Sequence, residues 1–246
     1  MDWTKAKTIL IAALILTNIT LAFFVIIEKR GNQEVHSEVI EETINFLNKR
    51  NIYVYTKIPQ NLKKMPVLEV EYFDYSIENI DKAMNEKEFK LNRNLSEDEA
   101  VKLTKKFLDR NNLMNNNVHL DSIKKEVDGY SIVYKNYYKD ILLEECYMSI
   151  LINNGKIVNF EREWYYPIKP GENKKKTIPA TTALMKFAIK KENLNEETVI
   201  TGIDLVYWLE DNSMFNMENT TLDTALPAWK ITYNNDEKKY INAYED

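Results

Sequence analysis

Four glutamates are the residues of this sequence that most directly suggest catalysis. They fall on two predicted strands: Glu144, Glu145, Glu161 and Glu163. Two carboxyl groups held close together can serve as general acid and general base. Glu161 and Glu163, however, alternate along one strand, so both should point to the same solvated sheet face near lysines. We expect this pair to be structural, and the sequence does not predict an enzyme.

The sequence gives little indication of a catalytic nucleophile or a metal site. Cys146 is the only cysteine, so no intrachain disulfide can form. It lies in an apolar predicted strand where a thiolate is disfavoured, and we expect a small buried side chain. The only histidines, His36 and His119, belong to no recognisable catalytic triad or zinc motif. The glycine patterns that bind phosphate groups are also missing from the sequence. No catalytic residue, metal or cofactor is predicted.

Composition narrows the class of partner. The 246-residue chain is 44% hydrophobic and 29% charged, with a net charge of −5. This balance suits one or two folded domains and excludes a multi-span membrane protein. An acidic chain without arginine-rich runs does not present a nucleic-acid surface, so no nucleic acid is predicted as a partner.

Aromatic residues are a more informative excess, with 15 tyrosines and four tryptophans. Tyr and Trp combine a large contact area with a polar tip, which suits protein interfaces. The alternative is an aromatic core with tyrosines at sheet edges. The run of Trp164, Tyr165 and Tyr166, at a predicted strand end, is the best candidate for an exposed partner interface.

One segment has the properties of a membrane span. Thr8 to Ile27 is a twenty-residue stretch without a charge, and a helix of that length spans about 30 Å, the thickness of a bilayer core. A cleaved signal peptide is the alternative, but the run ends in bulky apolar residues without a cleavage pattern. Lys5 and Lys7 precede it and Lys29 and Arg30 follow it, which leans slightly towards a cytoplasmic N-terminus. We predict a single-pass cell-membrane protein whose bulk is extracytoplasmic.

A polar residue inside that span suggests a helix contact. The amide of Asn18 cannot be satisfied fully within its own helix, and such residues often bond to a neighbouring membrane helix. Ala13 and Thr17 add a small-xxx-small pair that allows close approach, and the Thr17 hydroxyl can return to a backbone carbonyl one turn earlier. Ala13, Thr17 and Asn18 are therefore the predicted transmembrane interface, and a simple anchor with a tolerated polar residue is the alternative.

Periodicity outside the span predicts helices and strands. A helix is expected over 34–49, and Ser96 with Glu99 forms a capping box before an apolar-periodic helix. The Asn154-Gly155 pair predicts a hairpin turn. Strands are predicted at the following ranges: 51–55, 68–75, 118–125, 130–138, 141–152 and 156–164.

A second copy of this pattern follows about eighty residues later. Ala180, Ala183, Leu184, Phe187 and Ala188 repeat the spacing that begins at Ala100. Chance similarity between amphipathic elements is the alternative. We predict an α+β fold of tandem helix-on-antiparallel-sheet units. The predicted segments are a head and anchor (1–30), a stalk helix with first strands (31–95), a first unit (96–169), a linker (170–177) and a second unit (178–246).

The two ends of the chain resemble a known family. The start MDWTKAKTI over residues 1–9, the span containing Asn18, the motif PAWKI over 227–231 and YINA over 240–243 resemble the YycI (WalI) family of YycH/YycI-type regulatory proteins. The helix-plus-strand units also look like PepSY-type domains.

This resemblance implies a function and partners. It implies an extracytoplasmic domain without catalytic residues, and control of a WalK-type sensor histidine kinase jointly with a YycH-like protein. Such two-component systems govern cell-wall metabolism. The alternative is an anchored extracytoplasmic module that binds peptide or cell-wall ligands without a kinase partner.

Overall fold

The computed structural model describes residues 7, 14, 17, 18, 37–72, 77–91, 93–191, 196–209 and 222–245. The chain divides into two compact units, each drawn from several stretches of sequence. Unit 1 contains Met1–Lys64, Lys176–Ile203 and Ile231–Glu237, and unit 2 contains Met65–Lys175, Asp204–Lys230 and Lys238–Asp246.

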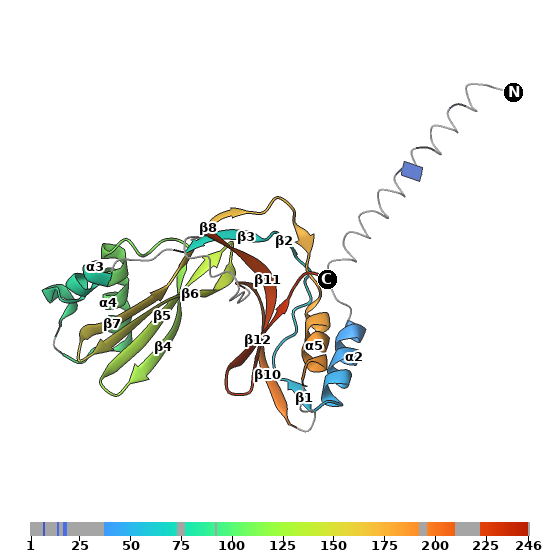
Figure 1. The fold of residues 1–246 in the computed structure, drawn as a ribbon. Coiled ribbons are helices and arrows are strands. Elements are labelled where there is room, and N and C mark those ends of the chain that lie inside the picture. The colour runs from blue at the N-terminus through green and yellow to red at the C-terminus, as the bar shows by residue number, and fades with distance from the viewer. Residues whose placement is uncertain are drawn as a thin grey trace. The chain divides into compact units, whose positions relative to one another are not determined.

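The centre of unit 2 is one helix on an antiparallel sheet (Figure 1). The elements are α4 (Glu97–Arg110), β4 (Val118–Glu126), β5 (Gly129–Tyr138), β6 (Ile141–Asn153) and β7 (Lys156–Glu163). The helix begins at the predicted capping box, in which Ser96 accepts from the Glu99 backbone N–H and the Glu99 carboxylate accepts from the Ser96 backbone N–H. It buries Ala100, Leu103 and Phe107 on the face turned to the sheet.

The two faces of this sheet differ in exposure. Along β5, buried residues alternate with partly exposed ones, and Ile132 pairs with Ile150 of β6 on the covered face. Phe107 of α4 meets Phe160 of β7 with ring centroids 5.7 Å apart. We call the opposite side of β5, β6 and β7 the outer face.

Shorter elements complete unit 2. They are α3 (Ile77–Met84), a 3-10 turn η1 (Lys87–Phe89), β3 (Leu68–Tyr72), β8 (Tyr165–Pro170), and parts of β10 (Thr198–Trp208), β11 (Leu222–Tyr233) and β12 (Glu237–Asn242). β3 pairs antiparallel with both β8 and the start of β11. The end of β10 joins β6 in parallel, with Tyr207 opposite Leu143.

Unit 1 packs two helices beside a short parallel strand pair. The helices are α2 (Ser37–Asn48) and α5 (Ala180–Ile189), and β1 (Ile52–Val54) runs parallel to the first residues of β10. Arg50 donates to the carbonyl of Ala188 at 3.1 Å, and Phe187 packs on Tyr233 with ring centroids 5.2 Å apart. The small strands β2 (Lys64–Met65) and β9 (Lys175–Lys176) complete the described elements.

The predicted α+β class is confirmed, and most predicted elements are present. The Asn154-Gly155 turn has positive φ at both residues, 48° and 71°, as the hairpin requires. The prediction missed α3, η1 and β8. The segment boundaries and the tandem repeat stay predictions.

Candidate functional site

Glu144 is the centre of a buried ion cluster in unit 2. Its side chain is 5% exposed and accepts three hydrogen bonds: from Lys238 at 2.8 Å, Lys230 at 3.1 Å and the Tyr240 hydroxyl at 3.1 Å. Lys135 lies 3.9 Å away and donates to the Glu144 backbone carbonyl at 3.2 Å. Strands β5, β6, β11 and β12 therefore meet at one carboxylate.

Electrostatics keep that carboxylate ionised. Burial on its own would raise the pKa of Glu144, but the hydrogen bond from Lys238 and the charges of Lys135 and Lys230 outweigh it, and the pKa lies below its ordinary value. A carboxylate with this many partners is held in place and is poorly suited to proton transfer. We interpret Glu144 as a structural residue that links the strands of unit 2.

Glu145, the next residue, is in the opposite electrostatic situation. Burial raises its pKa to about 7, and the neighbouring carboxylates of Glu144 and Glu163 add to the rise. Its Oε1 accepts the backbone N–H of Leu209 at 3.2 Å, at the end of β10. This is the described carboxyl group whose proton is most readily exchanged near neutral pH.

Cys146 is buried, as predicted. The Tyr165 backbone N–H donates to Sγ at 3.3 Å, and the thiol donates to the Tyr165 carbonyl at 3.4 Å. Burial raises its pKa to about 12, so the thiolate that a nucleophile needs is not formed at neutral pH. Its role is to pack β6 against β8.

The two histidines are the next residues to place in the structure. His119 lies exposed on β4 with its ring 5.1 Å from that of Tyr137, and His36 lies outside the described residues. Among the residues that the structure describes, no three His, Cys, Asp or Glu side chains gather closely enough to hold a metal ion.

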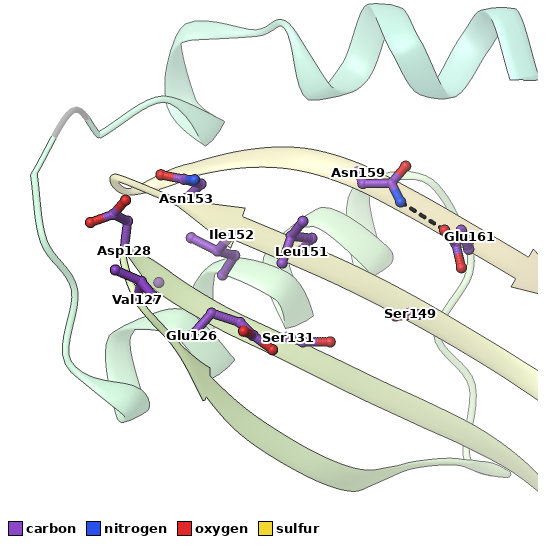
Figure 2. Close-up of a pocket in the computed structure, with 11 residues that line it drawn as sticks. Glu126, Val127, Asp128, Ser131, Ser149, Leu151, Ile152, Asn153, Asn159 and Glu161 are labelled. Carbon is purple, nitrogen blue, oxygen red and sulfur yellow. Dashed lines mark hydrogen bonds between the residues drawn. The ribbon is translucent and has the colours of Figure 1, made fainter.

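The outer face of β5, β6 and β7 carries a groove (Figure 2). We call it the serine groove because Ser131 and Ser149, on neighbouring strands, are among the residues that line it. It is lined by Glu126, Val127, Asp128, Gly129, Ser131, Ser149, Leu151, Ile152, Asn153, Asn159 and Glu161. Glu161 is exposed at the rim and accepts a hydrogen bond from Asn159 at 2.9 Å, so it faces solvent as the strand pattern predicts.

Sequence reasoning found only Glu161 of this groove. The signal that could have pointed to the rest is the position of Ser131 and Ser149, which alternate along their strands with buried apolar residues such as Ile132 and Ile150. Short polar side chains at such places leave a hollow between larger neighbours.

The aromatic run after β7 is less exposed than predicted. Trp164 is only 2% exposed, so the expectation of an exposed indole is wrong. The guanidinium of Arg162 lies 5.3 Å from the Trp164 ring and 5.8 Å from the Tyr166 ring, and it donates to the Tyr166 hydroxyl at 3.0 Å. Tyr165 packs on Tyr72 with centroids 5.3 Å apart.

The physical reason is the missed strand. Tyr165 starts β8, which pairs with β3 and so draws the run into unit 2 instead of leaving it at a free strand end. Tyr165 and Tyr166 stay half-buried, and a partner interface there stays a prediction.

The predicted membrane contact lies partly outside the described residues. Ala13 lies outside the described set, whereas Thr17 and Asn18 are helical and exposed. The Thr17 hydroxyl donates to the Leu14 carbonyl at 3.1 Å, as predicted. Within the described part of the chain, no helix has the length and apolar character needed to cross a membrane.

Comparison with known proteins decides the family. The chain matches the family described as YycI protein over residues 31–244, which is most of its length. The chain belongs to the YycI family. At the family level, this membership supports a regulatory role in the WalK/WalR two-component system.

Other comparisons add little to this YycI-family assignment. Among curated proteins, no match is found. Among solved structures, the C-terminal domain of YpeB from Bacillus megaterium is similar, with 11% identity over 86% of this chain and 94% of that one. The TM-score is 0.37, too low for the likeness to carry an argument.

Proposed function

We propose that this YycI-family protein is a membrane-anchored accessory regulator of a WalK-type sensor histidine kinase, acting with a YycH-like protein. The observation that carries the proposal is the family match over residues 31–244, which begins just after the apolar stretch Thr8–Ile27. The anchor would cross the membrane with its N-terminus in the cytoplasm, and the matched region, with its PepSY-like tandem units, would lie outside the cell.

The mechanism is stabilisation of one signalling state of the kinase. A bound protein shifts a two-state kinase only by its differential affinity for the two states. A coupling of about 1–3 kcal/mol changes the balance several-fold to about a hundredfold. Membrane-helix contacts through Ala13, Thr17 and Asn18, together with contacts of the exported region, would supply that difference.

A non-enzymatic role is part of the proposal. Two of the groups that invited a catalytic interpretation have structural explanations: Glu144 is engaged by lysines and Tyr240, and the Cys146 thiol is buried and protonated. Regulation by binding needs neither of them as a reactive group.

The test is photocrosslinking from position 18 of the full chain in native membranes. A photoreactive residue at Asn18 should capture the kinase or a second single-span regulator. The matched control is position 16, which lies about 200° round a helix and should face another side. Capture of lipid alone from position 18, while the complex still assembles, would overturn the membrane-helix part of the mechanism.

The second candidate function is an anchored binding module without a kinase partner, and the serine groove is the observation that favours it. Deletion of the gene decides between the two. Kinase output that changes in the deletion strain supports the regulator, whereas unchanged output, with a ligand bound by the full chain, supports the binding module.

A further inference from the structure

We propose that the serine groove binds an extended segment of a protein partner that carries lysine or arginine side chains. The inference deepens the proposed function, on which it rests for the presence of a protein partner outside the membrane. It names the exported surface and the chemistry of what that surface takes.

The hollow itself follows from the register of three strands. Ser131 lies opposite Leu151, which lies opposite Asn159, and in the next row Val133, Ser149 and Glu161 follow one another across the sheet. Short serines beside larger neighbours leave a depression whose floor includes the half-buried Leu151. Gly129 lines the same groove, and no larger residue fits there, because a Cβ would lie 1.9 Å from the Ile152 carbonyl oxygen.

Within the described residues, the outer face is the side of β5, β6 and β7 that α4 does not cover. The covered face is closed by α4, where the Thr104 hydroxyl meets the Tyr134 hydroxyl at 2.7 Å. On the outer face, Ser131, Ser149 and Leu151 of the groove are partly exposed (Figure 2). A partner segment lying across this face would meet the outward-pointing side chains, which recur with a period of two along each strand.

The charge of the rim selects a cationic occupant. Three carboxyl groups line the groove, from Glu126, Asp128 and Glu161, and no Lys, Arg or His does so within the described residues. Glu126 is paired with Lys124 at 3.2 Å, and the Glu161 partner at the rim is the neutral amide of Asn159. The groove therefore keeps a net negative charge, which attracts cationic segments and repels acidic ones.

The apolar part of the lining favours a peptide over a free cation. Val127, at the tip of the turn between β4 and β5, is 98% exposed, and Leu151 offers an apolar floor. The aliphatic stems of lysine and arginine cover such surface while their charged ends reach the carboxylates. The serines and asparagines can in turn bond to peptide backbone groups.

The experiment is site-specific photocrosslinking of the full chain in cells, with the photoreactive residue at Val127. This side chain is almost fully exposed, so its replacement leaves the core of unit 2 unchanged. The control position is Tyr55 of unit 1, which is 76% exposed. The captured peptide is sequenced, and it should come from another protein and carry Lys or Arg beside the crosslink.

Charge neutralisation then tests the chemistry. The variant E126Q/D128N/E161Q removes three negative charges with little change of shape, and we expect capture from position 127 to fall about tenfold, equivalent to about 1.4 kcal/mol. The matched control, E41Q/E172Q/E197Q, removes three exposed carboxylates elsewhere and should leave capture unchanged. Thermal melting of both variants shows that the fold is retained.

The outcomes separate this inference from the proposed function. Equal capture in both triple variants, capture of a segment without Lys or Arg, or capture of a second copy of this chain overturns the groove proposal. The groove proposal is also overturned if position 127 captures no protein while position 18 still captures the kinase or regulator. In that case the proposed function stands. Capture of a cationic segment at 127 with only lipid at 18 supports the groove and removes the membrane-helix contact.

Discussion

At the residue scale, Glu144 is the buried charge on which unit 2 most depends. Glu144→Gln would remove the counter-charge nearest to Lys135 and Lys230, which are 14% and 13% exposed. Lys230 would keep the more exposed Asp204 carboxylate, 4.0 Å away. Removal of one partner from a buried ionic network lowers the free energy of unfolding by about 3–5 kcal/mol. Because Lys238 is more exposed and can be solvated, we expect a smaller loss of about 2–4 kcal/mol. Urea unfolding at pH 7 measures it, and Glu161→Gln, at an exposed site, should change stability by less than about 0.5 kcal/mol.

The pH dependence of that loss follows from the lowered pKa of Glu144. The folded state keeps the carboxylate charged to a lower pH than the unfolded chain does. The stability it contributes is therefore present above the ordinary value of 4.5 and lost as pH falls through the folded pKa. The gap between wild type and Glu144→Gln should close in acid, and a gap that stays constant down to pH 3 would contradict the ionic explanation.

Glu145 should behave in the opposite way. Its folded pKa is about 7 and its ordinary value 4.5, so the folded state binds the extra proton between these values and stability falls as pH rises through that window. Glu145→Gln removes the cost of ionisation and can still accept the Leu209 N–H. We expect the variant to be about 1–2 kcal/mol more stable than wild type at pH 8, after discounting for solvent, and nearly equal at pH 5. Equal stability of both proteins at pH 8 would show that Glu145 ionises normally.

Burial that follows from the pattern of one strand was easier to predict than burial that depends on distant strands. The burial of Cys146 follows from its apolar strand, and the exposure of Glu161 follows from alternation. The burial of Trp164 could not be predicted from the sequence, because it depends on the pairing of β8 with β3. These two strands lie about a hundred residues apart in the chain. The lysines around Glu144 come from three strands for the same reason, and no local pattern announces them.

At the element scale, the start of α4 offers a clean test of local sequence. Ser96→Ala removes the side chain that accepts from the Glu99 backbone N–H. Loss of an N-cap of this type costs about 1 kcal/mol. Urea unfolding measures it, and Ser96→Asp, which can cap the same amide, should restore most of the loss. A Ser96→Asp variant as unstable as Ser96→Ala would show that the cap contributes little.

Elements with strong local signals were predicted, and elements held by tertiary pairing were not. The capping box and the Asn154-Gly155 turn each act over a few residues, so the sequence reveals them. α3 has only eight residues, and helices this short depend on packing, here through Ile80 and Ala83. β8 carries Pro167, which argues against a strand, yet β8 ends the strand order beside β3, where an edge tolerates proline.

At the scale of the whole molecule, chain order and spatial grouping differ. The predicted segments are continuous, whereas each compact unit takes three separate stretches, and β10 and β11 contribute residues to both. Helical and strand periodicity reveals the order of elements and the α+β class. Long-range pairing, such as β1 with β10, joins residues about 145 apart and leaves no periodic trace.

The function proposed for the whole chain predicts that the anchor is more than a tether. Replacement of residues 8–27 by an alternating Leu-Ala span of the same length keeps the membrane attachment but removes Ala13, Thr17 and Asn18 as a set. A reporter of WalK-type kinase output in cells should change several-fold, in the direction seen on gene deletion, since a coupling of about 1–3 kcal/mol is lost. The control is the same replacement with Asn restored at position 18, which should recover much of the wild-type output through its interhelical bond. Wild-type output from the Leu-Ala chain, with normal membrane levels on immunoblot, would assign the regulation to the exported region alone and leave the serine groove as the surface to test next.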